Sequence, residues 1–339
     1  GFSSGSTGRP KGVVRRHEAW VQTFAAATDA FGLGPGGRFL VPGPLHFSAS
    51  LFAALHTLEI GCTLMLERRF SPRRAAAFLA GAGVTGAFMV PTLYQSLVDE
   101  SEGLPVTADL CLISCGEKLR PGLRHALGLR YPNARILEYY GSSETGFISM
   151  LPPEFSDQPA SVGLTFPGVE IRIVGQDGVP VSAGEVGVLH VRSTMMAAGY
   201  LGAGDSVTPF VDAGGWVATG DLARTDRQGL IYLEGRADDA ITSGGATVFP
   251  AEVEAVLAAH PAVAEVAVVG RSHPKRGEEI VAALVLRPGA EASAAELRSA
   301  CIARLAPHKR PRALLILPDL PRTETGKVCR RQLRAQLQD

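Results

Sequence analysis

Short continuous apolar runs alternate with segments of helical spacing along residues 13–134. The apolar runs have the length of buried strands and lie at residues 62–67, 86–90, 110–114 and 135–140. The segments with helical spacing lie at residues 18–31, 50–59, 71–82, 92–100 and 120–130. Apolar strands that alternate with helices are typical of a parallel sheet covered on both faces. We therefore expect an α/β fold with a parallel-sheet core, in which ligands lie beyond the carboxyl ends of the strands.

The pattern changes near Val162, where shorter apolar runs lie among glycines and turn residues. The runs EIRIVGQDG, GEVGVLHVRS and GLIYLEGR predict an antiparallel β segment. A polar, glycine-rich stretch follows, and after it come a helix from about Pro250, strands at 263–271 and 279–287, a helix at 294–305 and a last strand at 313–318. We expect a domain boundary near Asp238, with a core domain at 1–237 and a small mobile C-terminal α+β domain at 238–339.

Charge is balanced over the chain. Lysine plus arginine and aspartate plus glutamate are 33 each in 339 residues, of which 46% are hydrophobic. A chain without a global field has no means of gathering nucleic acid or an anionic membrane, so neither is expected as a partner. Arginine pairs are predicted to be solvated faces of helices or loops, and they lie at Arg15/Arg16, Arg68/Arg69 and Arg73/Arg74.

Cysteine and histidine usage indicates neither a disulfide framework nor a zinc site. The cysteines number 5, an odd count, and the 8 histidines form no HxxxH or HxH pair. Reduced thiols in a cytoplasmic protein fit this usage. We expect no membrane span, because no apolar run reaches the length of one.

SSGSTGRPKG, at residues 3–12, has the composition of a loop that wraps phosphate. Glycines let successive N–H groups point at one anion, hydroxyls add donors, and Lys11 adds charge. The glycine spacing differs from the Walker A pattern, and no Ser or Thr follows Lys11. The same residues also fit a flexible linker, so both interpretations stay open on composition alone. A helix is expected directly after the loop, from Val13.

Two later stretches carry candidate nucleotide contacts. In YYGSSETG, at 139–146, a purine could stack on Tyr140 and the carboxylate of Glu144 could hold a hydrated Mg²⁺. In WVATGDLAR, at 216–224, Asp221 could accept both hydroxyls of a ribose. A polar strand-to-loop turn and an Asx turn are the alternatives that the residues leave open.

Two further stretches lie in the second half of the chain. GRADDAITSGG, at 235–245, offers Arg236 for phosphate or ribose, and its position suits a hinge or an interdomain linker. PRTETGKVCRRQLR, at 321–334, carries Lys327 after a turn. That lysine could stabilise charge developing on a carboxylate or phosphate oxygen, or it could be a surface lysine.

Taken together and in this order, these stretches resemble the adenylate-forming superfamily of acyl-CoA synthetases, adenylation domains of nonribosomal peptide synthetases, and beetle luciferases. The resemblance spans Ser3 to Arg334. It identifies residues 3–12 as similar to the phosphate loop of that superfamily, which favours the loop over the linker.

The resemblance implies site residues, all of which are expectations. It implies ATP or AMP contacts from Ser4, Ser6, Thr7, Lys11, Gly116, Glu117, Tyr140, Gly141, Thr145, Asp221 and Arg236. It implies catalytic roles for Lys327, His46, Thr145 and Glu144, with Glu144 also the Mg²⁺ ligand. It implies a hinge at Asp238 and a thiol tunnel lined by Gly244 and Gly245.

The chemistry that the resemblance implies has two steps and needs ATP, Mg²⁺ and CoA. A carboxylate attacks the α-phosphorus of ATP and pyrophosphate leaves, and a thiol then attacks the resulting acyl-adenylate. Because two anions must meet in the first step, positioning and charge neutralisation are the main demands. A small-molecule carboxylic acid is the expected substrate, the acceptor is CoA or a carrier-protein phosphopantetheine, and a homo-oligomer is left open.

The stretch HFSASLFAAL, at 46–55, favours an acid without an α-amine, because it has no carboxylate to pair with an ammonium group. A non-catalytic nucleotide-binding protein is the alternative from another class. Relative to the superfamily, the chain lacks the usual region before the phosphate loop. We expect this difference to leave open sheet edges and exposed apolar residues, which favour association.

Overall fold

The computed structural model describes residues 2–3, 11–81, 83–100, 106–158, 160–202, 206–322 and 328–337. The chain divides into two compact units. The first unit holds residues 1–219 and 224–233, and the second holds residues 220–223 and 234–339. The domain boundary at Asp238 stays a prediction.

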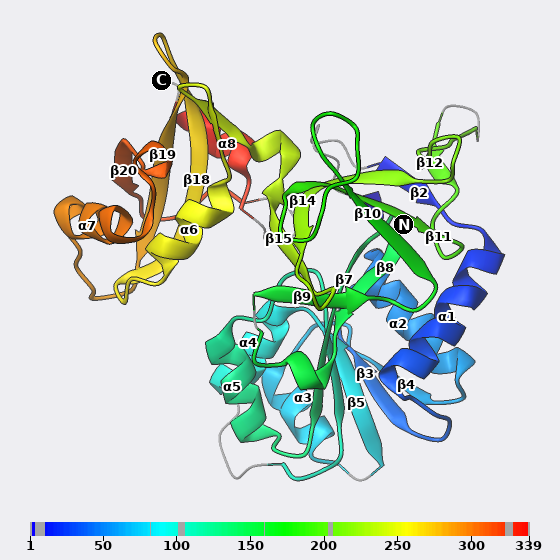
Figure 1. The fold of residues 1–339 in the computed structure, drawn as a ribbon. Helices are drawn as coiled ribbons and strands as arrows, with labels where there is room; N and C mark the ends of the chain where they lie inside the picture. The colour runs from blue at the N-terminus through cyan, green and yellow to red at the C-terminus, as the bar shows by residue number, and fades with distance from the viewer. Residues whose placement is uncertain are drawn as a thin grey trace. The chain divides into compact units, whose positions relative to one another are not determined.

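The first unit contains a parallel sheet whose strand order is β4-β3-β5-β6-β7. Its strands are β3 (Arg38–Val41), β4 (Thr63–Leu66), β5 (Val84–Met89), β6 (Cys111–Ser114) and β7 (Arg135–Ser142). Its helices are α1 (His17–Phe31), α2 (Ser48–Glu59), α3 (Pro72–Leu79), α4 (Pro91–Glu100) and α5 (Pro121–Arg130). Figure 1 shows α3, α4 and α5 on one face of these strands and α1 and α2 on the other. The predicted α/β fold with a parallel-sheet core is confirmed.

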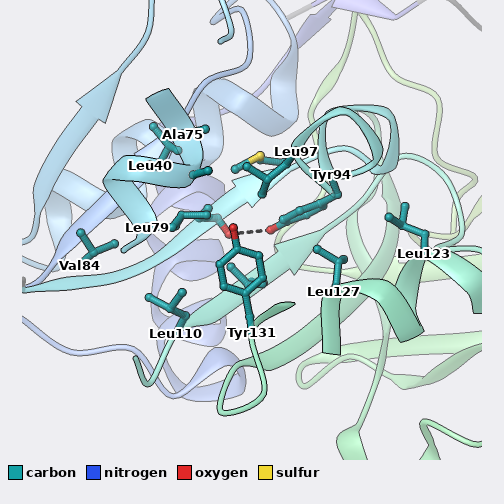
Figure 2. Packing of buried hydrophobic residues seen from close by; sticks show 14 of the residues in the cluster. Leu40, Ala75, Leu79, Val84, Tyr94, Leu97, Leu110, Leu123, Leu127 and Tyr131 are labelled. Atoms are coloured by element: carbon teal, nitrogen blue, oxygen red, sulfur yellow. Dashed lines mark hydrogen bonds between the residues drawn. The ribbon is translucent and has the colours of Figure 1, made fainter. Parts of the chain in front are cut away.

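A large apolar cluster lies between this sheet and helices α3, α4 and α5 (Figure 2). It is rich in leucine and contains two fully buried tyrosines, Tyr94 and Tyr131. The hydroxyl of Tyr94 lies 3.1 Å from the carbonyl oxygens of Ala87 and Ile113, so it has a hydrogen-bond acceptor inside the core. Because both faces are covered, β6 is buried at every residue, which explains its continuous apolar run.

Beyond β7 the same sheet becomes antiparallel and reaches 11 strands, in the order β10-β11-β14-β15-β9-β8-β7. The added strands are β8 (Gly146–Leu151), β9 (Ser161–Thr165), β10 (Val169–Val174), β11 (Gly187–Ser193), β14 (Val217–Thr225) and β15 (Ile231–Arg236). A short 3-10 helix, η1 (Pro153–Phe155), connects β8 to β9. This region contains the antiparallel segment that the glycine-punctuated runs predict.

A separate 4-stranded sheet has the order β1-β2-β12-β13. Its strands are β1 (Phe2–Ser3), β2 (Lys11–Val14), β12 (Gly199–Leu201) and β13 (Val207–Thr208). The expected helix from Val13 is therefore wrong at its start, because α1 begins at His17. Val13 and Val14 pair instead with Tyr200 and Gly199 of β12, a distant partner that local spacing does not reveal.

The second unit is built on a 5-stranded sheet of order β17-β16-β19-β18, with β20 parallel to β19. Its strands are β16 (Ile241–Ser243), β17 (Ala246–Val248), β18 (Val263–His273), β19 (Gly277–Leu286) and β20 (Ala313–Ile316). Its helices are α6 (Pro250–Ala258), α7 (Ala294–Arg304) and α8 (Arg330–Gln336), with 3-10 turns η3 (Ala237–Asp239) and η4 (Pro307–Lys309). Apolar residues of α6 and α7 pack in one cluster, and Leu333 of α8 packs in another.

Two further expectations concern the whole chain. All five cysteines are free, as reduced thiols would be. Four of them are buried, and Cys329 is half-buried. Among the described residues, no helix is both long and apolar enough to cross a bilayer.

Candidate functional site

The candidate site of the first unit lies where β6 and β7 end. These two strands are parallel neighbours, and Ser114, the last residue of β6, pairs with Glu138 of β7. The segment after Ser114 carries Gly116 and Glu117, and the end of β7 carries Tyr140. The predicted ligand-binding edge of the sheet therefore brings residues from two separate sequence stretches side by side.

The tight turn between β7 and β8 fixes the segment that contains Glu144. Thr145 is 1% exposed, and its Oγ1 accepts a hydrogen bond from the main-chain N–H of Ser142 at 3.2 Å. A Cβ on Gly141 would overlap the carbonyl oxygen of Gly146, so this close approach of the two strands needs glycine. Thr145 supports the turn, and its expected contact with the α-phosphate stays a prediction.

The carboxylate of Glu144 lies next to a tyrosine that sequence reasoning missed. The hydroxyl of Tyr200, in β12, donates to Oε1 of Glu144 at 3.1 Å. Partial burial, helped by the adjacent Glu144 carboxylate, raises the pKa of Tyr200 to about 12, so the phenol keeps its proton near neutral pH. Nζ of Lys11 lies over the ring of Tyr200, 4.9 Å from its centre. Tyr200 thus contacts both the lysine and the carboxylate that the sequence selects for phosphate and Mg²⁺.

Arg15 connects three segments of the same region. Its guanidinium donates to the carbonyl oxygens of Met195 and of Ser143, the latter at 3.2 Å. Burial lowers the pKa of Arg15 to about 10, and the group stays charged at neutral pH. The prediction of a solvated Arg15/Arg16 pair is therefore wrong for Arg15 and holds for Arg16, which is exposed.

The segment after β6 turns at Gly116, whose φ is +85°. Gly116 and Glu117 are both exposed, as residues facing a ligand would be. The segment is anchored at its far end, where the main-chain N–H of Leu119 donates to Oε2 of Glu138 at 2.9 Å. Tyr140 is half-buried at the end of the adjacent strand.

His46 lies in the turn that precedes α2. Its side chain is exposed, and its ring centre is 4.2 Å from that of Phe47. The turn is joined to the Glu144 segment by a hydrogen bond of 2.7 Å between the hydroxyls of Ser48 and Ser143. The first unit thus brings His46, Lys11, Tyr140 and Glu144 into one connected region.

The second unit contains the remaining described candidates. Nε of Arg236 lies 2.9 Å from Oδ1 of Asp221, so these two predicted nucleotide contacts form an ion pair. Asp238 is exposed within the 3-10 turn η3.

The glycine pair of the second unit forms the turn between β16 and β17. Gly244 and Gly245 both have a positive φ, of 60° and 83°, as this tight turn requires. The main-chain N–H of Gly244 donates to the carbonyl oxygen of Arg276 at 3.0 Å. Their role in a thiol tunnel stays a prediction.

Ser4, Ser6, Thr7 and Lys327 lie outside the described residues, and their roles also stay predictions. Within the described ranges, no group of three or more potential ligands could hold a metal ion by itself. The single carboxylate of Glu144 fits Mg²⁺ nonetheless, because protein Mg²⁺ sites on nucleotides use one or two carboxylates together with phosphate oxygens and water.

Comparison with known proteins gives two family models that match this chain. The model described as AMP-binding enzyme matches residues 1–201, and the AMP-binding enzyme C-terminal domain matches residues 252–327. Between them the two models match most of the chain.

Curated relatives match over nearly the whole chain. An uncharacterized acyl–CoA ligase of Bacillus subtilis, YhfT, is 33% identical over 100% of this chain and 68% of its own length. A 2-succinylbenzoate–CoA ligase of Bacillus velezensis is 34% identical over 98% of this chain and 67% of its own length. A sulfoacetate–CoA ligase of Cupriavidus necator is 32% identical over 98% of this chain and 65% of its length. The chain thus spans about two thirds of these relatives.

Solved structures agree in fold. ATP-bound MatB from Rhodopseudomonas palustris has a TM-score of 0.89 at 27% identity, covering 100% of this chain and 67% of that one. The o-succinylbenzoate CoA synthetase MenE of Bacillus subtilis, in complex with its acyl-adenylate intermediate, has a TM-score of 0.87 at 32% identity, covering 100% and 68%.

Proposed function

The chain belongs to the AMP-binding enzyme family, and from that premise we propose that it joins a carboxylic acid without an α-amine to the thiol of CoA, using ATP. The resemblance to the adenylate-forming superfamily and the assignment to the acid–thiol ligase class are confirmed. ATP, Mg²⁺ and CoA are the expected cofactors of this class. The relatives are named for different acids, among them sulfoacetate, 2-succinylbenzoate and fatty acids.

In the first step a carboxylate oxygen attacks the α-phosphorus of ATP, and the bond to pyrophosphate breaks. Tyr140 and the Gly116–Glu117 segment would hold the adenine between them. Lys11 would neutralise phosphate charge, and Glu144 would hold Mg²⁺, which supplies further neutralisation when it is bound. Asp221 and Arg236 would contact the ribose. Lys327 would stabilise the charge that develops as the two anions meet.

In the second step the sulfur of CoA attacks the acyl carbonyl carbon, AMP leaves with the bonding electron pair, and the thiol proton passes to solvent. On the family resemblance, we propose Asp238 as the hinge and Gly244 and Gly245 as lining residues of the thiol passage. His46 would lie between the acyl and thiol passages. The turn that carries it leads into α2, and residues 46–55 have no carboxylate that could pair with an ammonium group. This absence is the basis for proposing an acid without an α-amine.

One observation carries the proposal. Lys11, Tyr200 and Glu144 are in contact in series, from strand β2 to the turn after β7. These stretches are far apart in the sequence, and both belong to the part that matches the AMP-binding enzyme model. A lysine over the ring of Tyr200 and a carboxylate at its hydroxyl fit a phosphate chain with its Mg²⁺.

The test is carboxylate-dependent exchange of radioactive pyrophosphate into ATP, over a panel of aliphatic, aryl and amino acids. We expect exchange with one class of acid that lacks an α-amine. We expect Lys327→Ala to lower the rate about 10²-fold or more, because it removes a charge that acts in the transition state. Lys275→Ala, an exposed lysine of the second unit, is the matched control and should keep the wild-type rate.

Exchange with amino acids alone would contradict the substrate class, and a folded chain that exchanges with no acid would contradict the activity. The acceptor is decided separately, by offering CoA and a phosphopantetheinylated carrier protein to the enzyme in competition. Faster acyl transfer to CoA is the expected result.

A further inference from the structure

A buried carboxylate lies directly before the tyrosines at the end of β7. Glu138 is 5% exposed, and it directly follows the apolar residues Ile136 and Leu137 of β7. Its Oε2 lies 3.2 Å from Nζ of Lys118, and its Oε1 accepts hydrogen bonds from Nε of Arg124, at 3.2 Å, and from Nη2 of the same side chain. Glu138 therefore neutralises two cations in a place that water hardly reaches.

The same carboxylate also holds the main chain of the segment after β6. The N–H of Leu119 donates to Oε2 of Glu138 at 2.9 Å. Leu119 is itself 1% exposed, whereas Gly116 and Glu117, just before it, are exposed. The exposed part of the segment is thus fastened to β7 through a side chain of β7.

Arg124 adds a second attachment, from α5. Its side chain is 16% exposed, and Glu138 is the carboxylate that it contacts. Burial lowers the pKa of Lys118, and the nearby Glu138 carboxylate opposes that shift. The arrangement joins β7, α5 and the segment 116–119 in one network of charge-assisted hydrogen bonds, which are stronger than neutral ones.

We propose that Glu138 is a positioning residue for the base of the nucleotide. It sets the separation between the Gly116–Glu117 segment and Tyr140, and so determines how well an adenine ring fits between them, without touching the nucleotide itself. The proposal rests on the proposed function, which puts the adenine at these residues. The property that it explains is discrimination between purine bases.

The experiment compares binding of ATP and ITP, by calorimetry, to the wild-type chain, Glu138→Gln and Glu138→Asp. Inosine differs from adenosine at the base alone, so the affinity ratio isolates the base from the phosphates and ribose. We expect the ratio of ATP to ITP affinity to fall about fivefold or more in Glu138→Gln, because a charge-assisted hydrogen bond to the segment is lost. Glu138→Asp keeps the negative charge between Lys118 and Arg124 and withdraws it by one methylene, so it should also lower the ratio if Glu138→Gln does not fold.

Glu279→Gln is the matched control. The carboxylate of Glu279 accepts two hydrogen bonds from Arg271, at 2.9 and 2.6 Å, and its side chain is 14% exposed, but it lies in the second unit. This variant should lose thermal stability and keep the wild-type ratio of affinities.

Two results would overturn the role of Glu138. One is an unchanged ratio of ATP to ITP affinity in folded Glu138→Gln or Glu138→Asp. That result would mean that the contacts of Glu138 stabilise the fold and do not position the base. The other is a wild-type chain that binds ATP and ITP equally. A wild-type chain that binds neither nucleotide would instead overturn the proposed function, so the two failures are distinguishable.

Discussion

Glu138 and Glu144 stand on one strand and the turn that follows it, yet their surroundings differ. Glu138 is buried, and Lys118, Arg124 and a main-chain N–H satisfy its carboxylate. Glu144 is half-buried and accepts a hydrogen bond from the neutral phenol of Tyr200. Among the residues that the structure describes, Glu144 has no ion pair within 4.0 Å. A carboxylate saturated by cations suits positioning, whereas one that faces a neutral donor keeps the capacity to bind a cation.

The difference has opposite consequences for stability and for activity. Breaking a buried ion pair leaves an uncompensated charge and costs about 3–5 kcal/mol of folding free energy. Losing a partly exposed carboxylate that accepts one neutral hydrogen bond costs the fold little. Replacing Glu138 should therefore lower the free energy of unfolding, whereas replacing Glu144 should lower the rate of the reaction.

Glu144→Gln has the largest expected effect on activity. We expect pyrophosphate exchange to slow about 10²–10³-fold, since a charge that acts through Mg²⁺ on the phosphates is lost while the side chain keeps its shape. The free energy of unfolding should change by about 0.5 kcal/mol or less. Exchange rates over a Mg²⁺ titration, together with urea denaturation, measure both quantities.

The control for this variant is Glu154→Gln, an exposed carboxylate in η1 that should keep the wild-type rate. The expected difference between the two carboxylates would be contradicted if Glu144→Gln lost several kcal/mol of stability and kept its dependence on Mg²⁺. That outcome would make Glu144 a structural residue.

Arg15→Met tests a cation that contacts the segment of Glu144. Two main-chain carbonyl oxygens, of Ser143 and Met195, lose their donor, and we expect a loss of about 2 kcal/mol of stability and roughly tenfold slower exchange. Arg16→Met removes the same charge from an exposed neighbour and should alter neither quantity beyond about 0.5 kcal/mol. Equal effects of the two substitutions would show that charge alone, and not the held carbonyls, is what matters.

The parallel half of the first unit could be predicted from the sequence because its signals are local. Each strand there is a short apolar run buried on both faces, and the helices α3 and α5 begin at a proline, as many helices do. The strand β2 could not be predicted in this way. It is short, and it pairs with β12, whose residues lie far along the chain.

The residues of the candidate site also differ in whether the local sequence indicates them. Glu144 stands in the turn between β7 and β8 and Asp221 in strand β14, each within a motif of the sequence, so residue type and context point to them. Arg15 and Arg16 are adjacent residues of one type, and the distant carbonyl oxygens of Ser143 and Met195, to which Arg15 donates, distinguish them. Glu138 did carry a signal, because a carboxylate in a buried strand must be paired. The sequence alone does not show that Lys118 and Arg124 are its partners. Tyr200 had none, since it lies in none of the candidate motifs and its contacts with Lys11 and Glu144 join residues far apart in the sequence.

Tyr200→Phe is the smallest of the expected effects, and it isolates the hydroxyl. The phenylalanine ring keeps the place beside Lys11, and the carboxylate of Glu144 loses the donor at 3.1 Å. We expect about fivefold slower exchange, which corresponds to about 1 kcal/mol, because Glu144 is less firmly oriented toward Mg²⁺.

Tyr232→Phe provides the matched control, since the hydroxyl of Tyr232 also donates to a carboxylate at 3.1 Å, that of Asp226. This pair lies at the turn between β14 and β15, and neither residue is among the candidate site residues, so its loss should leave exchange unchanged. If Tyr200→Phe matched Tyr232→Phe, the phenol would have no part in orienting Glu144. If Tyr200→Leu were several times slower than Tyr200→Phe, the ring beside Lys11 would contribute separately from the hydroxyl. The neutral donor and the aromatic face would then each have a measured share in the site.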